Sequence, residues 1–306
     1  MKRPNIHFWF LWLTLLRLFA RADHGVITDV SDETFEFLIS GGHTHNIFRW
    51  SRHVVSIRTV SYLKNPGDNH FCAGILISSR AVLTAAHCLT DRYKATLKPR
   101  GIQVVFGHFK RLDSYNVHDD SRIADRLMVH PDYERYKKND LAIIRLNKRI
   151  PSYNPEVQPI ALRKKANVTV NNTCLTMGWG QLYQHGPYSD EILYLNVILS
   201  SPSDCKREID SFYEDDICVH PKTKGQMCAG DMGGPLICQG ALAGIIAGTM
   251  GCSEGRSMKF VSFPHYRDWI QKTVNDFKNG GVTLTMDMLM LCGGWLVSQL
   301  YQLLLY

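Results

Sequence analysis

Three short stretches of the sequence carry residues suited to acid–base and nucleophilic chemistry. His87 lies in LTAAHC, Asp140 begins the apolar run of NDLAIIRL, and Met232 lies in the glycine-rich turn CAGDMGGPLIC, between two cysteines. A histidine can serve as a general base near neutral pH, and a carboxylate can orient its ring. A turn of this composition is a common way to present a reactive side chain, but a methionine thioether has no proton to lose. The stretches therefore indicate a general base that has no nucleophile beside it.

In this order and with these flanks, the stretches resemble motifs of the trypsin/chymotrypsin family of serine proteases, namely TAAHC, a strand that begins Asp-Ile/Leu-Ala, and GDSGGP. The resemblance covers about residues 39–277. It implies that His87 is the general base, that Asp140 orients its ring, and that Met232 replaces the nucleophilic serine. It also implies that the backbone amides of Gly230 and Met232 occupy the positions of the oxyanion hole.

The resemblance implies an all-β fold of two six-stranded antiparallel β-barrels with a C-terminal helix. The residues alone predict a barrel or sandwich, because short β-rich runs alternate with Gly, Pro, Asn and Asp. These runs include RHVVSIRTVSYL, GIQVVFGHF, LAIIRL, CLTMGWG, LYLNVILS and GALAGIIAG. In FPHYRDWIQKTVNDF the apolar residues instead recur at helical spacing, with Pro264 near the start: Tyr266, Trp269, Ile270, Val274 and Phe277.

Other positions depart from the family pattern in the direction of lost activity. Leu38 precedes Ile39 where active relatives carry a cleavable basic residue, so a trypsin-type enzyme would not cut there. Without a new amino terminus at Ile39, Asp231 lacks the ammonium partner that it has in the family, and we expect it to find another. The specificity-pocket and substrate-strand positions are altered as well: Gln226, Ala247, Gly248, Thr249 and Met258. We expect Met258 to fill part of the pocket.

The leading hypothesis is a catalytically inactive serine protease homologue that acts by binding a protein, such as an active protease or its substrate. It would serve as a cofactor, decoy or regulator in a protease cascade, or in recognition at a surface. The alternative is a serine-type endopeptidase that keeps weak activity through another nucleophile. A metal-binding protein is a third hypothesis, but the 13 histidines form no cluster with ligand spacing. No cofactor, metal or nucleic-acid partner is expected.

The N-terminal residues have the composition of a targeting segment. Residues 1–22 combine a basic start, the apolar stretch IHFWFLWLTLLRLFA and a small-x-small site, which is typical of a signal peptide. The apolar stretch is short for a membrane span. Removal of residues 1–22, which carry four basic residues and no acidic one, lowers the formal net charge from +7 to +3. We expect a secreted protein with an acidic pro-segment at residues 23–38 and a trypsin-like domain at residues 39–278.

The last part of the chain, residues 279–306, is a hydrophobic tail, and its final 19 residues carry no charge. Asn279, Gly280 and Gly281, a polar spacer and the apolar end resemble a glycosylphosphatidylinositol (GPI) attachment signal. Asn279 is then the candidate attachment residue, and the protein is anchored to the outer face of the plasma membrane. A short membrane span and an amphipathic helix lying on the domain are the alternatives.

Nine cysteines in a secreted chain indicate disulfides with one cysteine left over, and Cys292 in the tail is the odd one. The sequence alone does not choose among the pairings of the other eight. The resemblance implies Cys72–Cys88, Cys174–Cys238, Cys205–Cys218 and Cys228–Cys252. The sequons at Asn167 and Asn171 predict N-glycosylation of an exposed connection.

Overall fold

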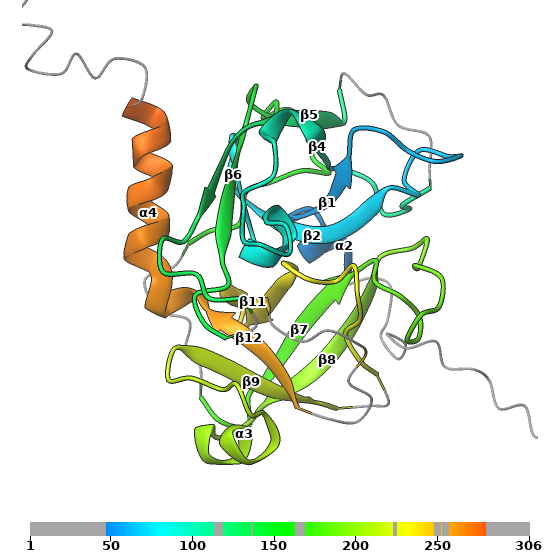
Figure 1. The fold of residues 1–306 in the computed structure, drawn as a ribbon. Coiled ribbons are helices and arrows are strands. Elements are labelled where there is room, and N and C mark those ends of the chain that lie inside the picture. The colour runs from blue at the N-terminus through cyan, green and yellow to red at the C-terminus, as the bar shows by residue number, and fades with distance from the viewer. Residues whose placement is uncertain are drawn as a thin grey trace, which may run out of the picture. The chain divides into compact units, whose positions relative to one another are not determined.

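The computed structural model describes residues 47–112, 119–135, 137–162, 169–222, 225–247, 252 and 257–279. The predicted signal peptide, the pro-segment and the tail beyond Asn279 lie outside these residues, and so do Leu38, Ile39 and Cys292. Within the described ranges, twelve strands form two closed barrels of six antiparallel strands each (Figure 1). The fold class predicted from the family resemblance is therefore confirmed.

The first barrel has the strand order β1-β2-β3-β6-β5-β4 and closes where β1 pairs with β4. Its strands are drawn from blue to green in the upper part of Figure 1. Their bounds are β1 Val54–Thr59, β2 His70–Ser78, β3 Ala81–Thr84, β4 Ile102–Val105, β5 Ser121–Val129 and β6 Ala142–Leu146.

The second barrel has the order β10-β11-β12-β9-β8-β7 and closes where β10 pairs with β7. The turn that contains Met232 leads directly into β10, so the barrel places this turn at one of its ends. The strand bounds are β7 Thr173–Gly178, β8 Leu193–Leu199, β9 Asp216–Pro221, β10 Pro235–Cys238, β11 Ala241–Ile246 and β12 Met258–Ser262.

Helices connect and cover the barrels. The predicted C-terminal helix is α4, Phe263–Asn279, and the shorter elements are α2 Ile47–Ser51, the 3-10 helices η2 Ala86–Leu89 and η3 Pro99–Gly101, and α3 Pro202–Glu208. Helix α3 was not predicted, although Ser201 caps it through a 3.2 Å bond from the amide of Asp204 and Pro202 occupies its first turn. No helix in the described part of the chain is both long and apolar enough to cross a membrane.

Both faces of several strands are buried. The neighbours Ile143 and Ile144 of β6 belong to two different apolar clusters, and successive side chains of a strand point to opposite faces. The cluster that contains Ile143 also includes Tyr266 and Ile270 of α4, so the helix covers one of these faces. This double burial explains why LAIIRL and GALAGIIAG are continuous apolar runs and do not alternate with polar residues.

Four disulfides join the pairs that the resemblance implies: Cys72–Cys88, Cys174–Cys238, Cys205–Cys218 and Cys228–Cys252. The first of them connects β2 to η2, the short helix that carries His87. The last connects the glycine-rich turn to the segment between β11 and β12. The predicted reactive region is therefore cross-linked on both sides.

Candidate functional site

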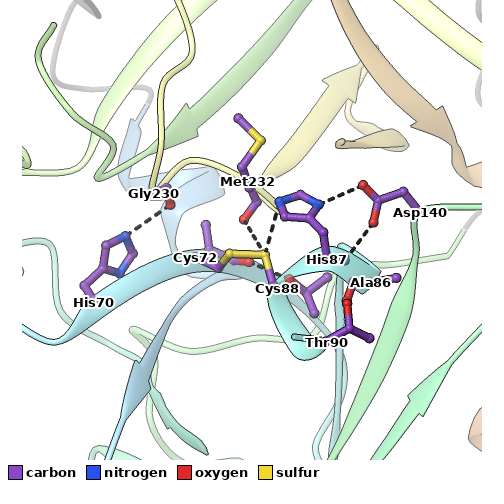
Figure 2. The surroundings of a disulfide bond; sticks show 11 residues. His70, Cys72, Ala86, His87, Cys88, Thr90, Asp140, Gly230 and Met232 are labelled. Atoms are coloured by element: carbon purple, nitrogen blue, oxygen red, sulfur yellow. Dashed lines mark hydrogen bonds and ion pairs between the residues drawn. A yellow bond between two sulfur atoms is a disulfide. The ribbon is translucent and has the colours of Figure 1, made fainter. Parts of the chain in front are cut away.

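His87 and Asp140 lie side by side, as the motifs predict (Figure 2). The backbone amide of His87 donates to Oδ1 of Asp140 at 2.9 Å, and Nδ1 of the ring lies 2.7 Å from Oδ2. The carboxylate therefore fixes both the position of the ring and its tautomer. With Nδ1 carrying the proton, Nε2 keeps a lone pair that can accept one.

The side chain of Asp140 is only 4% exposed. Burial alone would raise the pKa of its carboxyl group. The attraction and the two hydrogen bonds from His87, with a smaller contribution from Lys259, outweigh burial, and the pKa lies below its ordinary value. Asp140 is consequently a carboxylate at neutral pH, the form that accepts both hydrogen bonds.

Met232 lies in the turn before β10 and beside the ring of His87 (Figure 2). Its carbonyl oxygen accepts a 2.9 Å hydrogen bond from the amide of Ala73. Gly230, two residues before it, and Gly233, directly after it, have φ of 99° and 82°, which glycine adopts without strain. The backbone of this turn thus has its own requirements, whatever the side chain at position 232.

Among the described residues, Nε2 of His87 contacts Sγ of Cys88 at 3.8 Å, and this sulfur belongs to a disulfide and carries no proton. The thioether of Met232 carries no proton either. Cys72, His87 and Cys88 are close enough together to resemble a metal site. Their two sulfurs are bonded to each other and so cannot act as thiolate ligands.

The two amides at the oxyanion-hole positions are available. Among the described residues, the amides of Gly230 and Met232 donate to no acceptor, whereas that of Gly233 donates to Ile246 at 2.9 Å. Two unpaired amide donors in one turn are suited to stabilising a developing oxyanion. The arrangement contains the His87–Asp140 pair and these two amides, and position 232 carries no nucleophilic side chain.

Asp231 is buried, with 1% of its surface exposed. Its Oδ1 accepts a 2.7 Å bond from the amide of Gly180, and its Oδ2 accepts a 3.0 Å bond from the amide of Cys228. Within the described ranges the carboxylate accepts from these two amides, and no cation pairs with it. Burial raises the pKa of Asp231 to about 7, against the opposing effect of the two hydrogen bonds.

The residues at the predicted specificity positions are buried. Gln226, Ala247 and Met258 are between 1% and 4% exposed. Met258 on β12 pairs in register with Val219 and belongs to the same apolar cluster as Met232. Oε1 of Gln226 has no hydrogen-bond partner in the described part of the chain. Gly248 and Thr249 lie outside the described residues.

A buried polar chain behind the turn was not predicted from the sequence. Nε of Arg58 donates to Oγ of Ser56 at 2.8 Å, Oγ lies 2.8 Å from Nδ1 of His70, and Nε2 of His70 lies 3.1 Å from the carbonyl oxygen of Gly230. Because the guanidinium and the carbonyl have fixed roles, Ser56 donates to Nδ1, and Nε2 donates to Gly230. Burial, with a smaller effect of Arg58, lowers the pKa of His70 to about 3.

Arg111 continues this network into the surrounding loops. Its Nε and Nη1 donate to the carbonyls of Ser189 and Gly67, at 2.9 and 2.7 Å, and its own carbonyl accepts from Nη2 of Arg58 at 3.0 Å. Arg111 therefore joins three segments that are distant in the sequence. Isolated arginines in β-rich runs give no pattern that could have revealed this role.

The remaining predicted positions are the candidate glycosylation and anchor-attachment residues. Asn171 is exposed, has φ of 69°, and its amide donates to the carbonyl of Leu199 at 2.9 Å. Asn167 lies outside the described residues, and Asn279 is the last residue of α4. An exposed asparagine is accessible to glycosylation, and its modification stays a prediction.

Two antiparallel six-stranded barrels, with a histidine–aspartate pair and a glycine-rich turn where they meet, define a chymotrypsin-type serine protease domain. The sequence profile of the family described as Trypsin matches residues 39–270. The chain therefore belongs to the trypsin family.

Its relatives carry protease names. Chymotrypsin-2 of Vespa crabro is 32% identical over 204 residues, which are 66% of this chain and 88% of the relative. Trypsin II-P29 of Gallus gallus is 33% identical over 213 residues, which are 67% of this chain and 80% of the relative. Among solved structures, human heparin binding protein matches with a TM-score of 0.62 and 25% identity, over 78% of this chain and 97% of that one.

Proposed function

We propose that this chain is a secreted serine protease homologue that acts by binding a protein and does not turn over peptide substrates. The observation that carries the proposal is Met232, whose thioether takes the place of a nucleophilic hydroxyl beside His87. An alcohol attacks a carbonyl by giving its proton to the base, and methionine has none to give. Loss of the nucleophile in a related mechanism costs about 10⁶ in turnover.

Three further features support this proposal. Leu38 does not offer a trypsin-type cleavage site before Ile39. Asp231 is satisfied by two backbone amides, so its carboxylate has partners without a new amino terminus. Met258 is buried in the core cluster, at a position where the family keeps its pocket open with glycine.

A protein partner suits this fold because the family binds extended peptide chains along its cleft. A homologue that binds without cleaving can present, shield or reposition the bound chain. An active protease or a protease substrate is therefore the partner we propose, and the role is that of a cofactor, decoy or regulator. A role in recognition at a surface would likewise depend on binding a protein chain without cleaving it.

The second candidate function is a serine-type endopeptidase with weak activity. It is favoured by the protease names of the relatives, by the His87–Asp140 pair, and by the unpaired amides of Gly230 and Met232. It requires a nucleophile from another residue. Cys228 is the nearest cysteine in sequence, but its sulfur is committed to the Cys228–Cys252 disulfide.

We also propose the processing predicted from the sequence. The signal peptide at residues 1–22 is removed, residues 23–38 form a pro-segment, residues 39–278 form the binding domain, and the tail directs GPI attachment at Asn279. The protein would then lie on the outer face of the plasma membrane. Release of the protein from intact cells by phosphatidylinositol-specific phospholipase C tests the anchor, and complete retention after this treatment contradicts it.

A fluorophosphonate probe, which labels activated serines, tests the absence of catalysis. The full chain is produced in mammalian cells beside a Leu38→Arg, Met232→Ser double variant and a Leu38→Arg, Met232→Ala control, and all three are treated with trypsin. We expect labelling of the serine variant only. Labelling of the native chain would show an active serine elsewhere and would refute the proposal.

If none of the three is labelled, the cleft has changed at positions other than 232, and a serine at this position is not enough to restore a reactive site. The native chain is therefore also tested for cleavage of a mixed peptide library, which does not depend on the type of nucleophile. Cleavage that persists in the Met232→Ala control and is absent from a His87→Ala variant would favour the endopeptidase.

A further inference from the structure

A pocket of about 210 Å³ lies where the end of α4 meets the first barrel. Its walls come from the β2–β3 turn, from the segment after β6 and from the last turns of the helix. The residues that carry the argument are Ser78, Ser79, Arg80, Arg149, Val274 and Phe277. The volume is below the range of typical drug-sized sites, so the pocket suits a small group of atoms.

The polar side of this pocket is cationic. Arg149 is exposed, its Nη1 donates to Oγ of Ser79 at 3.2 Å, and no ion pair is formed by it within the described ranges. Arg80 is held rigidly, because its Nε and Nη2 donate to the carbonyls of Leu146 and Asn147, at 2.7 and 3.0 Å. Two guanidinium groups and a hydroxyl thus meet at one opening.

The nearby acid does not neutralise this cationic charge. Asp125 lies 3.7 Å from Nη2 of Arg80 and 2.6 Å from Nη2 of Arg145. One carboxylate is therefore shared by two arginines, and its closer contact is with Arg145. Arg149 adds a third guanidinium to this region, so the three positive charges exceed the single negative charge of Asp125.

The other side of the pocket is apolar. Val274 and Phe277 are partly buried and pack on the cluster beneath α4. The guanidinium of Arg145 lies 5.6 Å from the ring centroid of Phe277, on the same face of the molecule. A ligand that fits has an anionic group beside a less polar part.

The position of the pocket indicates where that ligand is found. Phe277 stands two residues before Asn279, where α4 ends and the hydrophobic tail begins. A GPI anchor at Asn279 and a membrane-inserted tail would both bring this end of the helix to a bilayer surface. This step rests on the membrane attachment proposed above.

We propose that this pocket binds the phosphate of an anionic phospholipid headgroup, with Arg149 and Arg80 as the cationic groups. A guanidinium matches the geometry of phosphate oxygens, and the adjacent apolar wall accommodates the glycerol part of the lipid. Binding there fixes the orientation of the domain on the membrane, with α4 ending at the bilayer. The site is distinct from the region around His87 and from the proposed binding cleft.

Hydrogen exchange of the full chain, purified from cell membranes and placed in lipid nanodiscs, tests this proposal. One set contains phosphatidylcholine alone, and the other also contains phosphatidylglycerol. We expect the amides of residues 78–81 and 147–150 to exchange about fivefold more slowly in the second set. Arg149→Gln should abolish the difference, Arg149→Lys should keep part of it, and Arg100→Gln, an exposed arginine elsewhere on the barrel, should leave it unchanged.

Inorganic phosphate is added to the phosphatidylcholine nanodiscs to separate the two sources of the anion. Equal protection by inorganic phosphate would mean a site for free phosphate and would overturn the lipid assignment. If exchange is equal in both lipid sets and the protein stays in the nanodiscs, the pocket does not bind the lipid phosphate. The proposed membrane attachment is then unaffected. A chain that leaves both kinds of nanodisc would refute the membrane attachment itself, and the lipid assignment with it.

Discussion

The carbonyl oxygen of Met232 accepts a 2.9 Å hydrogen bond from the amide of Ala73, so the residue in the nucleophile position connects the second barrel to strand β2 of the first. Gly233 next to it fits closely against the same strand. The glycine-rich turn is therefore part of the joint between the barrels. This role explains why the frame GDMGGP is useful to a chain whose central side chain has no nucleophilic chemistry.

Gly233→Ala should destabilise the protein strongly. A Cβ atom at this position would lie 2.1 Å from Oγ1 of Thr84 and 2.4 Å from the carbonyl oxygen of Ala73, on a backbone with φ of 82°. We expect the free energy of unfolding to fall by about 2–5 kcal/mol, measured by urea denaturation. The matched control is Gly101→Ala, whose Cβ would meet nothing within 4 Å and should change it by less than about 1 kcal/mol. Equal free energies of unfolding for the two variants would contradict the close packing of this turn between the barrels.

Asp140→Ala should be costly although no reaction depends on it in the proposed function. The substitution removes the acceptor of both hydrogen bonds from His87 in a buried position. A loss of about 2–4 kcal/mol in unfolding free energy is expected. Asp125→Ala, which removes a more exposed carboxylate paired with Arg80 and Arg145, should cost no more than about 1 kcal/mol. A cost for Asp140→Ala as small as that of the control would mean that the pair is not structural.

The His87–Asp140 contact also has a pH signature. The pKa of Asp140 is lowered in the folded state, so its stabilising contribution is present above the ordinary carboxyl pKa of 3.8 and is lost as the pH falls through the folded value. The cost of Asp140→Ala should therefore shrink in strongly acidic solution.

His70→Gln should change how stability depends on pH. Burial holds the pKa of His70 at about 3, down from 6.5, so only the unfolded chain takes up this proton as the pH falls between these values. The native chain then loses up to about 1.4 kcal/mol per pH unit, and glutamine, which can still donate to Gly230, does not. We expect the stability advantage of the native chain over the variant to decrease from pH 7 to pH 5 in urea titrations. An advantage that is constant over this range would contradict the buried neutral ring.

Lys259→Met should expose the cost of an unpaired buried acid. Nζ of Lys259 lies 3.5 Å from Oδ2 of Asp216, with side-chain exposures of 1% and 2%. We expect a loss of about 3–5 kcal/mol at pH 8, and partial recovery when Asp216→Leu is added. Burial already raises the pKa of Asp216 to about 6, so the defect of the single variant should be smaller at pH 5, where this group takes up a proton. Additive effects of the two substitutions would show that the pair is not coupled.

The sequence was sufficient for the features that short motifs and covalent cross-links define. His87, Asp140 and Met232 come together because their motifs specify strand ends and a turn that the fold brings to one place. The four disulfides and α4 follow from the resemblance and from helical periodicity. Strand ends were less accurate: RHVVSIRTVSYL suggested a strand up to residue 63, but β1 ends at Thr59.

The contacts of buried charged residues could not be predicted. Arg58, Arg111 and Lys259 lie in stretches that otherwise indicate strands or loops, and their partners are mostly backbone carbonyls that leave no trace in the sequence. Helix α3 has only seven residues, too few for a periodic pattern. Such features depend on tertiary placement, which residue types alone do not encode.

At residue 232 the backbone and the side chain have separate roles. Its backbone joins the two barrels through the bond from Ala73, and its side chain takes the place of a nucleophile in the function we propose. The side chain at this position can therefore change without loss of the backbone contact, provided that the new side chain fits the space. For a protein engineer, position 232 is therefore a place to test a new side chain while the backbone contact that joins the barrels is kept.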